Sequence, residues 1–258
     1  AGRDYYTFGS GRILGSDDWR NNPSAQSGVW YSHDMGGMNM NFAMLNGTET
    51  GNNEDNDGDD MVYTLSMDYA LDTGVLGTIN MTPYAVRAEA DDSQNWKGAA
   101  LAGSIMGFAY DAEYAKYDTH GGDDSSSAWA ISTSIDLDVL ASIPGITNGG
   151  VDISVSSADD DFQTIEGTSY GVGGFGGAND TQAWAGGTDI TSIGLNFSPA
   201  EGWDGRLASH DVDGVRKELD LSVGHDFNGN VAGWFGYAMV DPEGDNEDTV
   251  TFWTTLSV

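Results

Sequence analysis

The clearest pattern along the chain is the alternation of apolar and polar residues in MVYTLSMDY, Met61 to Tyr69. Met, Tyr and Leu occupy one parity, whereas Val, Thr, Ser and Asp occupy the other. Since neighbouring side chains of a β-strand point to opposite faces, the segment is predicted to be a strand with one apolar and one mostly polar face. The apolar face would lie in the core of a soluble sandwich but would face lipid in an outer-membrane barrel. The segment alone leaves both alternatives open.

The same period of two recurs along the whole chain, for example over 38–44, 129–139 and 219–227. No segment of the sequence shows a helical period over three turns. We therefore predict an all-β, antiparallel fold with about 14 strands in a single domain that covers residues 1–258. The predicted strands are residues 2–9, 26–34, 37–46, 60–71, 76–88, 96–106, 107–118, 126–140, 149–158, 186–198, 202–212, 214–227, 230–240 and 248–258.

The connections and the polar faces favour a barrel over a sandwich. Tight turns such as 228–230 alternate with long polar connections such as 46–60 and 168–187, which are predicted to lie on the same, extracellular side. The polar faces hold Ala, Gly, Ser, Thr, Asn and carboxylates, which suit a wet lumen better than a close-packed core. We predict a transmembrane β-barrel, either with about 14 strands or as part of a barrel of about 16–18 strands. Aromatic residues that suit the two membrane interfaces are Trp30, Tyr31, Trp129, Trp234, Phe235, Tyr237 and Trp253.

The composition excludes several classes of function. The chain has 41 acidic and 9 basic residues, which give a net charge of −32, and it has no Cys. Lys and Arg are the residues that contact phosphate backbones, so a nucleic acid is a very poor partner. The lack of Cys excludes disulfides, thiolate metal sites and cysteine nucleophiles. No apolar run approaches the roughly 20 residues of a transmembrane helix, which leaves a barrel open because half of each barrel strand is polar.

The first part of the chain, GRDYYTFGSGRILGSDDWRNNPSAQSGVWYSH, resembles the signature segment of the alginate-export-like family of outer-membrane porins. In that family a G-R-x strand precedes an R-[IL]-x-G-x-x-x-W turn and then the strand that begins the next hairpin. Segments 159–168, 203–212 and 216–258 are similar to later parts of the same family. The matching positions of the first segment are Gly2, Arg3, Arg12, Leu14, Gly15, Trp19 and Arg20.

This resemblance implies a porin of the bacterial outer membrane, embedded in the lipid bilayer with its lipopolysaccharide. Since family members carry further strands before the signature segment, the chain is expected to be a C-terminal portion or a shortened member. Export of an acidic polysaccharide would favour a basic lumen, whereas this chain has only 9 basic residues. The fold therefore carries over more safely than the substrate.

Carboxylates on the polar faces of the predicted strands are the candidate pore residues. Because they alternate with residues predicted to face lipid, they should line the lumen and attract cations. Adaptation to salt is the alternative explanation of the acidity. The predicted pore-lining carboxylates are Asp68, Asp111, Glu113, Asp136, Asp138, Asp152, Glu218 and Asp220.

The arginines of the first segment form a second candidate group. Arg3, Arg12 and Arg20 make up one third of the 9 basic residues of the chain. They could form one charged wall of the lumen and orient polar solutes, as charged rings do in selective pores. Alternatively, each arginine simply pairs with a carboxylate and fixes its segment.

Two further motifs fit a loop better than a specific site. GVGGFG at 171–176 matches the dinucleotide fingerprint, but no predicted helix follows it. The segment NNEDNDGDD at 52–60 begins like a calcium loop, and Asp55, Asp57 and Asp59 are a weak candidate site for Ca²⁺. Position twelve of that loop is Thr64 instead of Glu, so a solvated acidic loop is the alternative.

The expected function is passive diffusion of small hydrophilic solutes, with a preference for cations. No combination of nucleophile, base or metal ligands stands out, so we predict that the protein is not an enzyme and has no cofactor beyond loosely bound Ca²⁺. The alternative is a secreted, acidic, β-rich module that binds carbohydrate or belongs to a surface layer. Such a module would need a second sheet to bury its aromatic faces.

Overall fold

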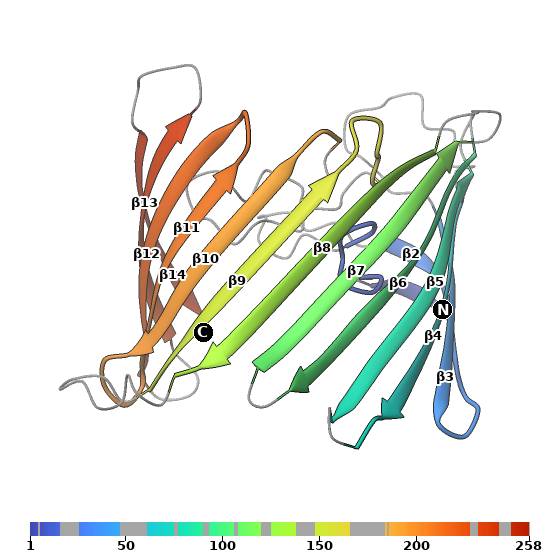
Figure 1. The fold of residues 1–258 in the computed structure, drawn as a ribbon, viewed down its shortest axis with the longest axis horizontal. Helices are drawn as coiled ribbons and strands as arrows, with labels where there is room; N and C mark the ends of the chain where they lie inside the picture. Colours follow the sequence, from blue (N-terminus) through green and yellow to red (C-terminus); the bar gives the residue numbers. More distant parts are fainter. Residues whose placement is uncertain are drawn as a thin grey trace.

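The computed structural model describes residues 1–4, 6–15, 26–46, 61–74, 77–89, 93–105, 108–119, 125–137, 148–165, 184, 186–227, 232–242 and 249–257. Fourteen β-strands form one sheet in the order of the chain, and neighbouring strands are antiparallel (Figure 1). The predicted all-β antiparallel fold is thus confirmed. The strands are β1 (Gly2–Asp4), β2 (Gln26–Asp34), β3 (Met38–Asn46), β4 (Met61–Asp72), β5 (Thr78–Glu89), β6 (Gln94–Ile105), β7 (Phe108–Thr119), β8 (Ser125–Asp136), β9 (Asn148–Ala158), β10 (Asp189–Ser198), β11 (Trp203–Val212), β12 (Arg216–Asp226), β13 (Ala232–Pro242) and β14 (Thr249–Ser257).

The sheet curls around a central space, and its strands lean in a common direction along the curved wall (Figure 1). Among the described residues β1 and β14 do not pair with each other, so the wall stays open between them. No helix within the described part of the chain is long and apolar enough to span a membrane.

The first strand is shorter than the predicted 2–9. It ends at Asp4, and the chain then turns inward. Gly9 and Gly11 have φ values of 57° and 81°, a left-handed conformation that interrupts an extended strand and that glycine adopts at little cost. The prediction for this segment was wrong because alternation alone did not account for these two turn positions.

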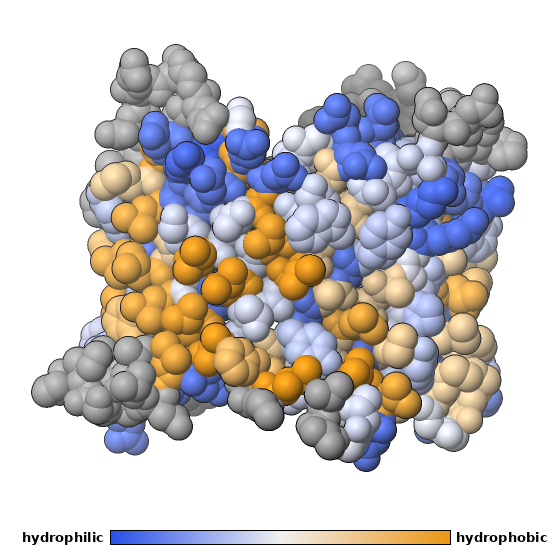
Figure 2. All heavy atoms as spheres, in the orientation of Figure 1, coloured by the Kyte–Doolittle hydropathy of each residue, from blue (hydrophilic) through white to orange (hydrophobic). Residues whose placement is uncertain are grey.

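The burial pattern of β4 shows which face of the sheet lies outside. Thr64 and Ser66 are buried, whereas Leu65 and Met67 are 42% and 37% exposed. This is the reverse of a soluble protein, in which large apolar side chains fill the core. Figure 2 shows apolar side chains across the middle of the outer surface and hydrophilic ones toward its upper edge. In the described residues no second sheet covers this face, so the sandwich alternative does not fit.

The connections alternate between two rims of the wall. The β2–β3 turn, with Gly36 and Gly37 at positive φ, lies at the lower rim in Figure 1, where it closes a tight hairpin. Two of the three longest gaps between strands, 47–60 and 159–188, both leave from the opposite edge, because the six strands β4 to β9 lie between them. This edge, the upper rim, carries the ends of β3, β5, β7 and β9.

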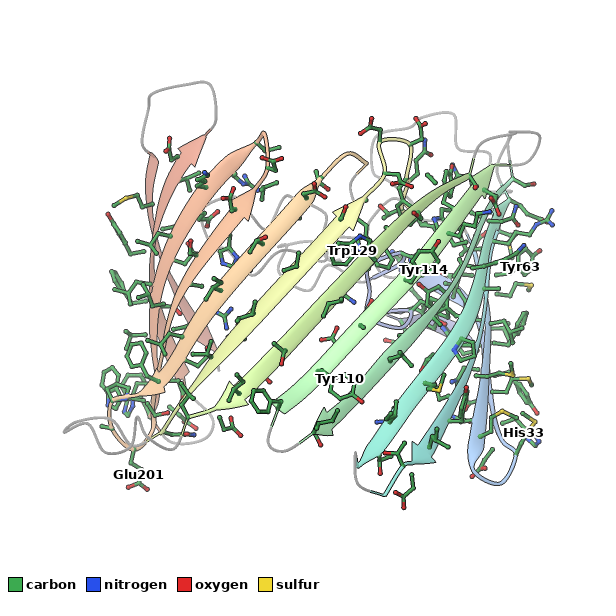
Figure 3. The ribbon with its side chains drawn as sticks, in the orientation of Figure 1. His33, Tyr63, Tyr110, Tyr114, Trp129 and Glu201 are labelled. Atoms are coloured by element: carbon green, nitrogen blue, oxygen red, sulfur yellow. The ribbon has the colours of Figure 1, made fainter. Side chains whose placement is uncertain are left out.

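Aromatic side chains occupy the outer surface near both rims. Figure 3 places Tyr63, Tyr114 and Trp129 at a similar height below the upper rim, and Tyr110 closer to the lower rim. Tyr114 and Trp129 are direct partners across β7 and β8. Aromatic rings at two levels are typical of proteins that cross a membrane, where such rings sit at the headgroup level.

Trp30 departs from the prediction that it faces outward. Val29 and Tyr31 are 44% and 53% exposed, so the period of two places Trp30 on the inner side of β2. There its ring lies 6.2 Å from that of Tyr6, centroid to centroid, and packs against the buried cluster. The prediction was wrong because the position of Trp30 in the alternating pattern, and not its aromatic character, decides which face it occupies.

The hydrophobic core of the protein lies on the inner side of the wall. Segments 6–15 and 159–165 fold inward, and the Ile165 N–H donates a hydrogen bond to the Ile13 carbonyl at 3.0 Å. Trp96 of β6 and Trp184 are fully buried in the same cluster. The chain therefore partly fills its own central space.

Replacing Met67 by Arg tests the outward orientation of the apolar face. A cation near the middle of the lipid-facing surface should cost about 2–4 kcal/mol. The free energy of unfolding, measured by urea titration of the protein in lipid vesicles, should fall by this amount. Met67→Leu is the matched control and should change little. Equal stability of Met67→Arg and the parent protein would show that this face does not meet lipid.

Candidate functional site

Residues 6–15, the inward segment, lie against the inner wall from β4 to β7. The hydroxyls of Tyr6 and Thr64 are 2.9 Å apart and hydrogen bonded, and the Phe8 ring meets Tyr84 edge-on with centroids 5.4 Å apart. Burial raises the pKa of Tyr6 above its ordinary value of 10.0, because the phenolate would lose hydration. The first half of the segment is thus held by uncharged contacts.

The second half of the segment is held by Arg12, whose side chain is buried. Its Nη1 lies 2.7 Å from Glu113 Oε2, and its Nη2 lies 3.5 Å from Asp111 Oδ1. The guanidinium also lies 5.8 Å from the centroid of the Trp184 ring. One cation therefore pairs with two carboxylates of β7 and contacts an aromatic face.

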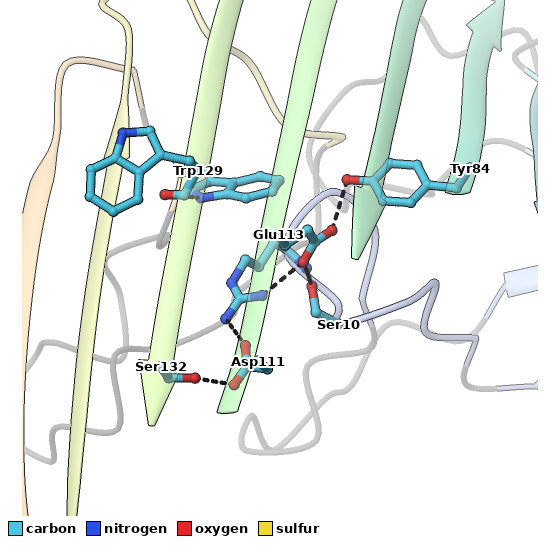
Figure 4. A network of polar contacts seen from close by, with 8 residues as sticks. Ser10, Tyr84, Asp111, Glu113, Trp129 and Ser132 are labelled. Carbon is cyan, nitrogen blue, oxygen red and sulfur yellow. Dashed lines mark hydrogen bonds and ion pairs between the residues drawn. The ribbon is translucent and has the colours of Figure 1, made fainter. Parts of the chain in front are cut away.

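These two carboxylates also accept hydrogen bonds from hydroxyl groups. The Tyr84 hydroxyl donates to Glu113 Oε1 at 2.7 Å, and the Ser10 hydroxyl donates to Glu113 Oε2. The Ser132 hydroxyl of β8 donates to Asp111 (Figure 4). Because a buried charge is costly unless it is both paired and hydrogen bonded, this network satisfies the requirement for Glu113.

A cavity of about 640 Å³ lies between the inward segment and β2 to β6. Among its described lining residues Asp68 is the one carboxylate, and it accepts hydrogen bonds from the Asn41 amide at 2.7 Å and the Thr82 hydroxyl at 2.8 Å. No described residue makes an ion pair with Asp68, so its negative charge acts on whatever enters the cavity. Aromatic and polar residues line the space: Tyr6, Thr7, Phe8, Gly9, Ser10, Trp30, Tyr31, Ser32, Asn41, Phe42, Ser66, Asp68, Thr82, Tyr84 and Ala100.

A second inner cation, Arg206 of β11, pairs with Asp152 of β9 across the intervening strand. Its two terminal nitrogens each donate to one carboxylate oxygen at 2.8 Å. Asn196 of β10 bridges the pair, donating to Asp152 at 2.7 Å and accepting from Arg206 at 3.0 Å. This two-pronged geometry fixes Arg206 against the wall.

His210 of β11 lies between a hydroxyl and a carboxylate. Its Nδ1 is 2.8 Å from Ser192 Oγ, and its Nε2 is 3.4 Å from Asp220 Oδ2. Ser192, His210 and Asp220 are only 4%, 2% and 1% exposed, so a substrate cannot reach the hydroxyl. The three side chains therefore cross-link β10, β11 and β12 instead of forming a hydrolytic site.

Most of the predicted pore residues lie on the inner parity of their strands. Their register with neighbouring strands puts them on the same face as the buried Thr64, Ala115 and Ala208. Their role in ion selectivity stays a prediction. This inner set comprises Asp68, Asp111, Glu113, Asp136, Asp152, Glu218 and Asp220 of the strands and Arg12 of the inward segment.

Arg3 was wrongly assigned to the lumen. It pairs with Ser27 of β2, which shares the outward parity of Val29 and Tyr31. The short β1 therefore presents Arg3 to the outside. Of the other predicted positions, Arg20, Asp138, Asp55, Asp57 and Asp59 lie outside the described residues.

Arg206, Arg216 and His210 also lie on the inner face but were not predicted as pore-lining residues. The alternation along their strands is the signal that could have identified them. In WDGRLASHDV, Arg206 and His210 alternate with the outward Leu207. Their partners could not be found in the same way, because they come from neighbouring strands in a register that local sequence does not show. Within the described part of the chain, no three His, Asp or Glu side chains gather as metal ligands.

Replacing Arg12 by Met should release the inward segment. The variant leaves the buried Glu113 without its cation, which costs about 3–5 kcal/mol locally. Single-channel conductance in planar bilayers should rise because the released segment no longer fills part of the central space. Arg87→Met, on the outer face, is the control and should conduct like the parent protein.

A companion variant makes this prediction specific to the ion pair. Glu113→Gln should also raise conductance, whereas the double variant Arg12→Met/Glu113→Gln should raise it less than the sum of the two single changes. Additive effects would mean that the two side chains do not hold the segment together.

No protein-family model and no curated protein sequence matches this chain. Solved structures from Pseudomonas aeruginosa do resemble it. The outer membrane protein OpdK is 10% identical with a TM-score of 0.68, covering 99% of this chain and 74% of its own. OccK3 (OpdO) is 14% identical with a TM-score of 0.64, covering 98% and 75%, and OccD3 (OpdP) is 12% identical with a TM-score of 0.61, covering 99% and 74%. These structures give no support for the alginate-export-like family in particular, so that resemblance stays a prediction. The chain has the fold of bacterial outer-membrane β-barrel porins.

Proposed function

We propose that the chain forms a channel of the bacterial outer membrane through which small hydrophilic solutes diffuse, with a preference for cations. The observation that carries this proposal is the division of the sheet into an exposed apolar face and an inner face with carboxylates. Leu65, Met67 and Ile131 are all at least 37% exposed, whereas Asp68, the residue after Met67 on β4, faces the inner cavity.

The distribution of inner charges supports the cation preference. Arg12 and Arg206 are each matched by carboxylates within 3.5 Å, which cancels most of their field. Asp68 and Asp136 make no ion pair with any described residue. These two carboxylates belong to a chain with a net charge of −32, so the lumen potential should be negative and should concentrate cations.

Anionic solutes are the competing candidate, and the structural neighbours give a reason to test them. Structures of OpdK with vanillate and of OccK2 with glucuronate have been solved, and both ligands are small organic acids. The resemblance of the first segment to alginate-export-like porins points the same way. The acidic inner face of this chain argues against such solutes, because a carboxylate ligand would meet more carboxylates than free cations.

Reversal potentials across a planar bilayer with a KCl gradient distinguish these candidates. The parent protein should be cation-selective at low salt, and selectivity should fade as salt shortens the Debye length to about 3 Å at 1 M. Asp68→Asn and Asp136→Asn should each lower the ratio of cation to anion permeability by about fourfold, because one unit charge at about 10 Å in water changes the local concentrations of cations and anions by about twofold each, in opposite directions. Asp211→Asn, on the outer face, is the matched control. Anion preference at low salt would contradict the cation assignment and favour organic acids.

A further inference from the structure

The outward-facing basic residues of the described chain all lie near the upper rim. Of the 9 basic residues, Arg12, Arg206 and Arg216 face inward, and Arg20 lies outside the described residues. Each of the other five lies within a few residues of a strand end at the upper rim. These outward cations are Arg3, Arg87, Lys97, Lys116 and Lys217.

Three of them form a cluster, the basic cluster, on adjacent strands: Arg87 on β5, Lys97 on β6 and Lys116 on β7. Lys97 and Lys116 are direct cross-strand partners, an arrangement in which like charges repel each other. Lys116 Nζ is 3.7 Å from Asp118, and Arg87 Nη2 is 3.2 Å from Glu89, with all four side chains at least 38% exposed. Exposed pairs of this kind contribute little and rearrange easily. Among the described residues no carboxylate pairs with Lys97.

The order of residues along β7 places the cluster at a defined depth. β7 runs toward the upper rim, and its successive outward residues are Tyr114, Lys116 and Asp118. Each step of two residues rises about 6.6 Å along the strand. Tyr114 belongs to the aromatic level that Figure 3 shows with Tyr63 and Trp129. Since such rings mark the boundary of the hydrocarbon region, Lys116 lies just beyond it, where lipid phosphates are found.

The tilt of the strands brings the other two cations to the same depth. In Figure 1 these strands lean toward β5 at the upper rim, so each step from β7 toward β5 along the hydrogen bonds descends by about 3 Å. Lys97 is the cross-strand partner of Lys116, one strand away. Arg87 is two strands away from Asp118, because Asn95 of β6 pairs with both of them. All three cations therefore lie within about 3 Å of one depth, and the two carboxylates lie farther out.

We propose that the basic cluster binds a phosphate group of lipopolysaccharide in the outer leaflet, an inference that rests on the proposed membrane location. A phosphate between Lys97 and Lys116 would replace their mutual repulsion by two attractions, and the guanidinium of Arg87 would supply further donors. The two long gaps at the upper rim assign this rim to the extracellular side, where outer-membrane barrels carry their long loops. The cluster thus faces the leaflet that contains the phosphorylated glycolipid.

The test measures how tightly the purified full chain in detergent binds diphosphorylated lipid A, by titration with native mass spectrometry. Lys97→Gln/Lys116→Gln should raise the apparent Kd at least about tenfold, since each basic residue near a lipid headgroup contributes to binding. Lys217→Gln is the matched control: it lies at the same rim on β12, beside Asp211, and should leave the Kd unchanged. Lys97→Gln alone should have an intermediate effect. Dephosphorylated lipid A and phosphatidylglycerol should bind the parent protein more weakly than diphosphorylated lipid A.

The outcomes separate this inference from the proposed function. The inference is wrong if the double variant binds diphosphorylated lipid A as tightly as the parent protein does. Equal binding of dephosphorylated lipid A also overturns it, because that ligand has no phosphate. Equal binding of phosphatidylglycerol overturns it as well, because the phosphate of any lipid would then suffice. Single-channel conductance of the same preparations shows that the double variant is folded. A protein that binds lipid A as expected but does not conduct contradicts only the channel, whereas one that does not insert into bilayers contradicts both.

Discussion

Each backbone N–H and C=O that crosses a bilayer must find a hydrogen-bond partner within the protein, and in this chain the neighbouring strand supplies it. The thirteen antiparallel pairings from β1 to β14 meet that constraint for one strand after another. Once the strands are paired in this way, the period of two sends alternate side chains to lipid and to the interior. The exposed Leu65 and the buried Thr64 are both consequences of the same ladder.

The interior that results is polar, and the protein stabilises it with charges placed in pairs. Arg12 and Arg206 are both held by carboxylates of other strands, at distances that charge-assisted hydrogen bonds require. A buried ion pair adds little to the free energy of unfolding, whereas removal of one partner lowers it strongly, because the other charge is left buried and unpaired. Such pairs therefore serve to position segments, and the Arg12–Glu113 pair holds the inward segment against the inner wall.

The two faces of the wall use charge for different purposes. Inside, Asp68 lies beside a cavity and makes no ion pair with a described residue, so we propose that its field acts on solutes. Outside, the basic cluster of Arg87, Lys97 and Lys116 lies above the aromatic level, where we propose that it binds a lipid phosphate. Of the basic residues that the structure describes, most lie either in inner ion pairs or at the upper rim of the outer face.

The sequence by itself determined the strands and the two faces, because alternation is a local property of neighbouring residues: β4 and the inner parity of Glu113 follow from it. It did not determine the path of residues 6–15, since the prediction of a strand over 2–9 missed the turns at Gly9 and Gly11. It also did not show that Arg12 meets Glu113, or that Lys97 lies opposite Lys116. Those contacts depend on the register and tilt of strands that are distant along the chain, and only the tertiary structure sets which residues such strands bring together.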